Sequence, residues 1–157
     1  MTHQVTIYNS TFDGWLDGAN PAYMRFKALP SRENAVKTAE AIENLRELYW
    51  HESGSNLTKP AFSEGRLFAR CPELELIQDL AELAKHGGRL RRANVKVKAI
   101  TGSGHAANAA PQSVVNTFGN LPSGPVCTLQ LELIDGTTLD VPEVLERAML
   151  FWRAELN

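Results

Sequence analysis

The chain has 157 residues, a length that predicts one globular domain spanning residues 1–157. Hydrophobic residues make up 43% of it and charged residues 22%, a balance that argues against intrinsic disorder. A formal net charge of −2 excludes a strong overall attraction to nucleic acid or to an acidic membrane. No stretch is long and apolar enough to span a membrane, and the first residues do not resemble a signal peptide, so we expect a cytoplasmic protein.

The first third of the chain is expected to begin with a strand over residues 4–8, followed by a loop over residues 9–21. Two Asp-Gly pairs surround large apolar side chains in this loop. We expect these side chains to fold back over the core, and an exposed aromatic binding loop is the alternative. Alternation of apolar and basic residues over residues 23–29 predicts a second strand, with a short helix beginning at Asn20-Pro21 as the rival interpretation.

Two helices are predicted in the middle of the chain. A serine N-cap and an amphipathic stripe predict the longest helix over residues 31–52. A polar loop over residues 53–65 and a short strand over residues 66–70 follow. A second helix then begins at Pro72 and ends at Gly87-Gly88, because glycine pairs are typical of helix ends.

The two cysteines, Cys71 and Cys127, do not form a CxxC motif, so neither a disulfide framework nor a zinc site is expected. Cys71 lies at the N-cap position of the second helix, where free backbone N–H groups stabilise a thiolate. The sequence offers Cys71 no assignable basic neighbour. We therefore favour an unreactive thiol over a reactive one, and we expect no bound metal or cofactor.

Residues 89–100 alternate as a strand with a basic face. Five cations lie within its first ten residues, at Arg89, Arg91, Arg92, Lys96 and Lys98. A solvated sheet face whose lysines discourage edge-to-edge pairing is the favoured interpretation. Weak nucleic-acid binding through residues 89–98 is the alternative, and the absence of interleaved aromatic residues argues against it.

The long loop over residues 101–125 exceeds the usual length of a connection between strands. It begins with Gly102-Ser103-Gly104-His105, which loosely resembles a phosphate-binding loop, but Pro111 ends any following helix too early for that function. If the loop forms a binding site, we expect these four residues to line it. His105 is then the candidate acid or base, and Arg91 and Arg92 are the candidate anion contacts.

The last quarter of the chain predicts a β-hairpin followed by a helix. A two-residue loop at Asp135-Gly136 would send the apolar residues of the second strand to the polar face. A three-residue loop over residues 134–136 keeps all of them on one face, with Gly136 in a left-handed bulge position. The expected cross-strand pairs are therefore Leu133 with Thr137, Leu131 with Leu139, and Leu129 with Val141.

Pro142 suits the first turn of the last helix, which reads as unusually apolar around much of its circumference. We expect either another element of the same chain, such as the longest helix, or another molecule to cover its second side, and we favour the first. The candidate partner interface consists of Met149, Leu150, Phe151 and Trp152.

These elements predict an α+β fold with a single antiparallel or mixed sheet of about five to six strands and three helices mainly on one face. No catalytic motif is recognisable. We therefore favour a non-catalytic protein that inhibits, neutralises or escorts another protein, as an immunity protein, antitoxin or adaptor does, or that forms a homodimer. A small enzyme or ligand-binding protein using the 101–125 loop is the second hypothesis, and nucleic-acid binding is the third.

Overall fold

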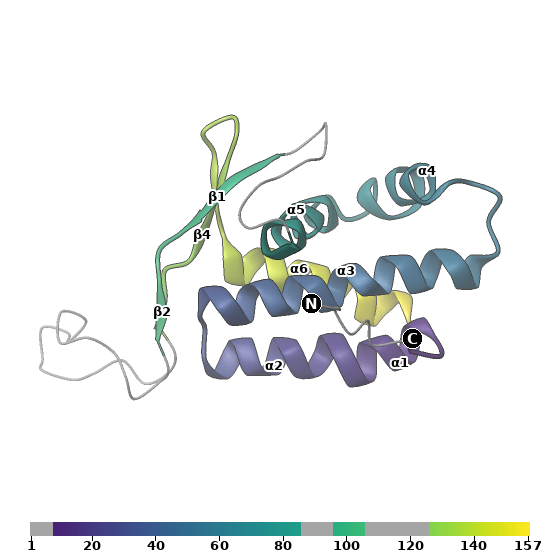
Figure 1. Cartoon of the computed structure of the whole chain (residues 1–157), viewed down its shortest axis with the longest axis horizontal. Helices are drawn as coiled ribbons and strands as arrows, with labels where there is room; N and C mark the ends of the chain where they lie inside the picture. Colours follow the sequence, from purple (N-terminus) through teal and green to yellow (C-terminus); the bar gives the residue numbers. More distant parts are fainter. Residues whose placement is uncertain (1–7, 86–95, 106–125) are drawn as a thin grey trace, which may run out of the picture.

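The long helix α3 forms the centre of the molecule in the computed structural model (Figure 1), which describes residues 8–85, 96–105 and 126–157. The α1–α2 segment lies along one side of α3, and α5 and α6 pack against α3 and against each other. In chain order the elements are α1 (Thr11–Gly14), the π-helix η1 (Trp15–Ala19), α2 (Asn20–Ala28), α3 (Arg32–Ser53), α4 (Lys59–Phe62), the π-helix η2 (Ser63–Phe68), α5 (Glu73–Lys85), β1 (Val97–Thr101), β2 (Gly104–His105), β3 (Val126–Cys127), β4 (Gln130–Leu133), β5 (Thr138–Asp140) and α6 (Val141–Glu155).

The predicted sheet of five to six strands is wrong, because the described part of the chain is mostly helical. Its main sheet is antiparallel and three-stranded in the order β1-β4-β5, and β2 pairs separately with β3. Two segments expected as strands, residues 23–29 and 66–70, lie mainly in the helices α2 and η2 instead. The predicted strand over residues 4–8 lies, apart from Tyr8, outside the described residues, as do residues 89–95 and the helix stop at Gly87-Gly88.

The segment expected as a strand over residues 23–29 belongs to α2, so the rival interpretation of a helix beginning at Asn20-Pro21 is confirmed. Ala19, Ala22 and Phe26 are buried, and their spacing follows the period of a helix. The Thr38 hydroxyl of α3 donates a hydrogen bond of 3.1 Å to the Ala22 carbonyl, which ties the two helices together. Three alternating residues were therefore too short a pattern to identify a strand.

The predicted loop over residues 9–21 is also wrong, because α1 and η1 run without a break into α2. The Ser10 hydroxyl accepts a hydrogen bond of 3.0 Å from the Asp13 backbone N–H and caps this helical segment. A Cβ atom on Gly14 would lie 2.7 Å from the Leu48 side chain, so this glycine allows the segment to approach α3 closely. Phe12 and Leu16 are each about half exposed, whereas Trp15 packs against the core, so one of the three large apolar side chains folds back as expected.

The predicted strand over residues 66–70 and the polar loop before it contain α4 and η2. Phe62 and Leu67 are both buried, and their spacing of five residues suits the wider turn of a π-helix. The buried Arg46 side chain of α3 donates a hydrogen bond of 2.7 Å to the Ser63 hydroxyl. This contact attaches η2 to the central helix.

The longest predicted helix is confirmed as α3. The Ser31 hydroxyl caps it by accepting from the Asn34 backbone N–H at 3.1 Å, and Gly54 ends it with a left-handed φ of 63°. The buried stripe of α3 includes Ala35, Ala39, Ile42 and Leu45, as its period predicts. The helix predicted from Pro72 is also present, as α5.

The three-residue hairpin loop is confirmed by the register of β4 and β5. Leu131 lies opposite Leu139, and the Leu133 backbone N–H donates to the Thr137 carbonyl at 2.8 Å. Gly136 has a φ of 91°, which is the left-handed conformation expected at the bulge. The hydrophobic alternation therefore selects the register correctly.

The final helix, α6, is not the unusually apolar element that the sequence suggested. One side of it is buried against α3 and α5, as expected if the chain itself covers the helix. The opposite side carries the exposed residues Glu143, Glu146, Arg147, Leu150 and Arg153. None of the described helices combines the length and the apolar character needed to cross a membrane.

Candidate functional site

The glycines of the predicted binding loop serve close backbone packing. A Cβ atom on Gly102, which has a φ of 86°, would lie 2.1 Å from the Thr128 carbonyl oxygen. A Cβ atom on Gly104 would lie only 1.5 Å from the Pro30 carbonyl oxygen. The Ser103 carbonyl accepts a hydrogen bond of 2.8 Å from the Thr128 backbone N–H. Gly102 and Ser103 thus pack against Thr128, between β3 and β4, and Gly104 packs against Pro30, just before α3. Close backbone packing therefore accounts for both glycines.

The remaining residues of that predicted site are not brought together in the described part of the chain. His105 pairs through its backbone with Val126, and its imidazole lies outside the described part. Arg91 and Arg92 also lie outside it, as do residues 106–125 of the loop. The hypothesis of a site built from His105 and the two arginines therefore stays a prediction.

The described end of the predicted basic strand is neutralised by carboxylates. The Lys96 ammonium lies 2.9 Å from Glu75, and that of Lys98 lies 3.5 Å from Glu132. The buried carboxylate of Asp79 accepts hydrogen bonds from the backbone N–H groups of Lys96 and Val97, at 2.8 and 3.2 Å. The structural role of Asp79 was missed, because nothing in the α5 sequence distinguishes it from the exposed acids around it.

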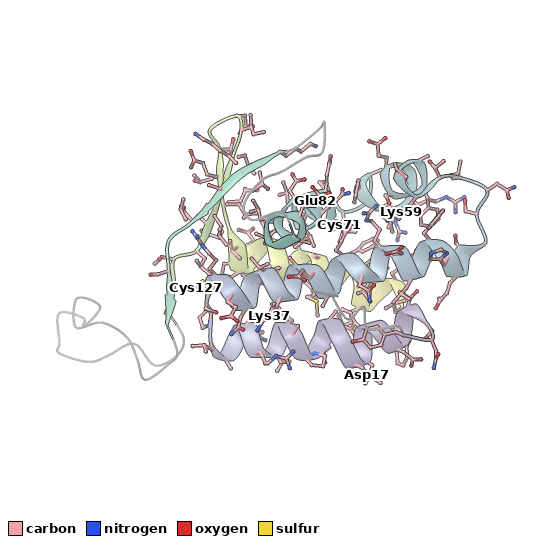
Figure 2. All side chains as sticks on the ribbon, viewed as in Figure 1. Asp17, Lys37, Lys59, Cys71, Glu82 and Cys127 are labelled. Carbon is pink, nitrogen blue, oxygen red and sulfur yellow. The ribbon has the colours of Figure 1, made fainter. Side chains whose placement is uncertain are left out.

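Cys71 lies in the passage from the α4–η2 segment to α5 (Figure 2). Its side chain is buried, and this burial together with the nearby Glu73 carboxylate raises the pKa of the thiol to about 11. Near neutral pH Cys71 is therefore a thiol, and this result agrees with the favoured interpretation of an unreactive cysteine.

The four residues of the candidate partner interface lie in different environments. Met149 and Trp152 are buried in the core, where the Trp152 ring packs edge-on against Tyr49 with 5.4 Å between centroids. Phe151 is half-buried, and the Arg70 guanidinium lies 5.0 Å above its ring. Leu150 is 56% exposed and is the member of this set that can contact another molecule most fully.

Leu150 borders a groove of about 520 Å³, here called the α2–α6 groove. Its two helices pack separately against α3 and run in opposite directions (Figure 1). Trp15 of η1 lines one end of the groove. The α2 wall consists of Asn20, Tyr23, Met24 and Lys27, and the α6 wall consists of Glu146, Met149, Leu150 and Arg153.

Each wall of the α2–α6 groove is a stripe at positions i, i+3, i+4 and i+7 of its helix, the spacing that helices use to pack against one another. Met24 is 53% exposed, close to the value for Leu150, so both walls offer apolar surface to a ligand. The Lys27 ammonium lies 5.5 Å from the centroid of the Tyr23 ring. Burial and the charge of Glu146 on the opposite wall raise the pKa of Tyr23.

Sequence reasoning identified only one wall of this groove. The α6 wall includes the predicted interface residues Met149 and Leu150, whereas the α2 wall was hidden by the expectation of a loop and a strand. The signal that could have revealed it is the helical spacing of Asn20, Tyr23, Met24 and Lys27.

Among the residues that the structure describes, no group of three or more His, Cys, Asp or Glu side chains is placed to hold a metal ion. The chain matches no protein-family model, and neither a curated protein sequence nor a solved structure is significantly similar to it. Its function must therefore be inferred from its own surface.

Proposed function

We propose that the protein is a non-catalytic protein-interaction module that inhibits, neutralises or escorts a partner protein. We further propose that the α2–α6 groove receives an amphipathic helix of that partner. The observation that carries this proposal is the pair of facing stripes, because two helical walls at this spacing leave a place for a third helix to pack.

The composition of the walls suits a protein partner. Tryptophan, tyrosine, methionine and arginine are the residue types enriched at protein interfaces, and Trp15, Tyr23, Met24, Met149 and Arg153 supply all four. Met24 and Leu150 are each about half exposed, so covering them completely contributes about 1 kcal/mol per side chain. These two residues should therefore be energetic anchors of the interface.

The charges on the walls favour a particular partner chemistry. Lys27 and Arg153 are cationic and Glu146 is anionic, so the lining carries one net positive charge. A partner helix with an apolar ridge and an acidic residue facing Arg153 would complement it. A ridge flanked by lysine and arginine would be disfavoured.

The test begins with a photo-crosslinking residue at position 150, which identifies the partner in extracts of the native cell. The identified partner is then purified, and its dissociation constant is measured with the original protein, with Leu150→Glu and with Ile134→Glu. Ile134 is 62% exposed in the hairpin loop, away from the groove, and serves as the matched control. Leu150→Glu should weaken binding at least about tenfold, because it places a charge in a desolvated apolar contact, whereas Ile134→Glu should change it little.

Equal affinities of the original protein and Leu150→Glu would contradict the proposed groove. Sedimentation of the purified protein separately tests whether a second copy is the occupant. We expect the purified protein to be a monomer. If it is instead a dimer, and if Leu150→Glu dissociates that dimer, the occupant of the groove is a second copy of the chain and not a different protein.

A further inference from the structure

A second groove, here called the α3–β1 groove, lies between α3, α5 and β1 and shares no lining residue with the α2–α6 groove. Its volume of about 630 Å³ falls within the range of small-molecule sites, about 300–1,000 Å³. Val36 of α3, Leu83 of α5 and Ile100 of β1 supply its apolar floor. Val36 and Leu83 are half-buried, so aliphatic surface remains open to a ligand.

The rim of this groove carries a fixed cation. The Arg32 guanidinium donates a hydrogen bond to the Ile100 carbonyl, which holds it beside the apolar floor. A guanidinium has five N–H donors, and a neutral carbonyl leaves its positive charge in place. The neighbouring Glu33 carboxylate already lies 2.9 Å from the Lys37 ammonium. Arg32 is therefore the rim group best placed to receive an anion.

We propose that the α3–β1 groove binds a free aliphatic carboxylate, with the carboxylate group on Arg32 and the hydrocarbon chain along Val36, Leu83 and Ile100. Arginine suits this head group because its planar fork matches the two oxygens of a carboxylate. Lys37 and Lys98 also border the groove, but the carboxylates of Glu33 and Glu132 already lie 2.9 and 3.5 Å from their ammonium groups, so the head group is assigned to Arg32. The Glu40 carboxylate, which also borders the groove, disfavours a ligand with a second anionic group. This inference does not depend on the proposed protein-binding function.

The test measures the binding of hexanoate, octanoate and decanoate to the full-length protein by titration calorimetry. Affinity should rise about twofold to fourfold for each added methylene group, because each one is removed from water on the apolar floor. Decanol, which has the same chain without the charge, should bind about tenfold more weakly than decanoate. A flat chain-length series, equal binding of decanol, or no binding in the millimolar range would overturn the proposal.

A variant pair tests the assigned head-group contact. Arg32→Gln should weaken decanoate binding about tenfold and leave decanol binding unchanged, whereas Arg25→Gln, an exposed arginine outside the groove, should alter neither. Equal decanoate affinity in Arg32→Gln and the original protein would refute the contact. Methyl NMR spectra should show decanoate shifting Val36, Leu83 and Ile100 and leaving Leu150 unaffected, and the reverse pattern would place the ligand in the α2–α6 groove instead.

One further measurement separates a free carboxylate from a lipid surface. Vesicles of phosphatidylglycerol and phosphatidylcholine should fail to sediment the protein. Sedimentation that Arg32→Gln abolishes would overturn the proposal in favour of an anionic membrane as the ligand.

Discussion

The absence of a Cβ atom at Gly104 allows β2 to lie close to Pro30, just before α3. Its backbone passes so close to the Pro30 carbonyl that a Cβ atom would lie 1.5 Å from the oxygen, well inside any permitted contact. Because the obstructing atom belongs to the backbone, a change of side-chain rotamer cannot relieve the clash. The local chain must move instead.

We therefore predict that Gly104→Ala lowers the free energy of unfolding by about 2–3 kcal/mol, the size of an overpacking defect. Gly65 provides the matched control, because nothing lies within 4 Å of a Cβ atom added there and its φ is not positive. Gly65→Ala should be neutral or stabilise the protein by up to about 1 kcal/mol, as alanine does in a helix. Urea denaturation measures both changes, and equal stabilities of the two variants would show that β2 is free to move away from Pro30.

At the scale of single residues, the prediction was correct for the β4–β5 hairpin, where the hydrophobic alternation is compatible with only one register. The hairpin register followed from parity, because a slip of one residue would have exposed Leu139 and Val141 together. The Gly102-Ser103-Gly104 sequence has no comparable pattern that would decide between a ligand site and close backbone packing. A glycine that leaves space for a ligand cannot be distinguished by sequence from one that leaves space for the backbone of the same chain. For Gly104 the packing partner is Pro30, which is distant along the chain.

At the scale of the elements, the outer edge of β1 is closed by side chains from two helices. Asp79 of α5 accepts hydrogen bonds from the Lys96 and Val97 backbone N–H groups, and Arg32 of α3 donates to the Ile100 carbonyl. Unpaired groups on an edge strand invite pairing with another chain. The helices therefore occupy positions that an intruding strand would need.

Asp79→Ala should lower the free energy of unfolding by about 2–3 kcal/mol, because it leaves the backbone N–H groups of Lys96 and Val97, at the start of β1, without their carboxylate acceptor. It should also increase self-association on mild heating, which light scattering detects. Glu40→Ala, which removes an exposed carboxylate from α3, should change the stability by less than about 0.5 kcal/mol. If Asp79→Ala matched that control in both measurements, the closed edge would have no protective role.

Prediction of the elements depended on the length of each pattern. The stripes of α3 and α5 repeat over several turns and were identified correctly. Residues 23–29 and 66–70, which overlap α2 and η2, were assigned to strands from windows of seven and five residues, in which two or three alternating side chains fit either period. The π-helical turns of η1 and η2 add a residue to the helical repeat, which further obscures it.

At the scale of the whole molecule, Glu155 joins three parts of the chain near the end of α6. Its carboxylate accepts two hydrogen bonds from Arg70, at 3.1 and 2.6 Å, and one of 2.6 Å from the Tyr49 hydroxyl of α3. The Arg70 contact, followed by that of Tyr49, lowers the pKa of Glu155, and the same carboxylate raises the pKa of Tyr49.

This contact predicts a pH dependence. Because the pKa of Glu155 is lower in the folded state, its stabilisation is fully present above the ordinary glutamate value of about 4.3 and is lost as the pH falls through the lowered value. Glu155→Gln should cost about 1 kcal/mol at neutral pH and less at about pH 2.5. Glu64→Gln, which changes an exposed glutamate of η2, is the control. A cost that stayed constant across this range would contradict the assigned ionic contact.

The closed edge of β1 also constrains the order in which the chain folds. The β4–β5 hairpin is local, so it can form early without help from the helices. The two side chains that close β1 belong to α3 and α5, and their hydrogen bonds exist only after those helices have docked. We therefore expect β1 to join the sheet late. Substitutions at Asp79 should speed unfolding more than they slow folding, giving φ-values near zero, whereas substitutions between α3 and α5 should slow folding itself.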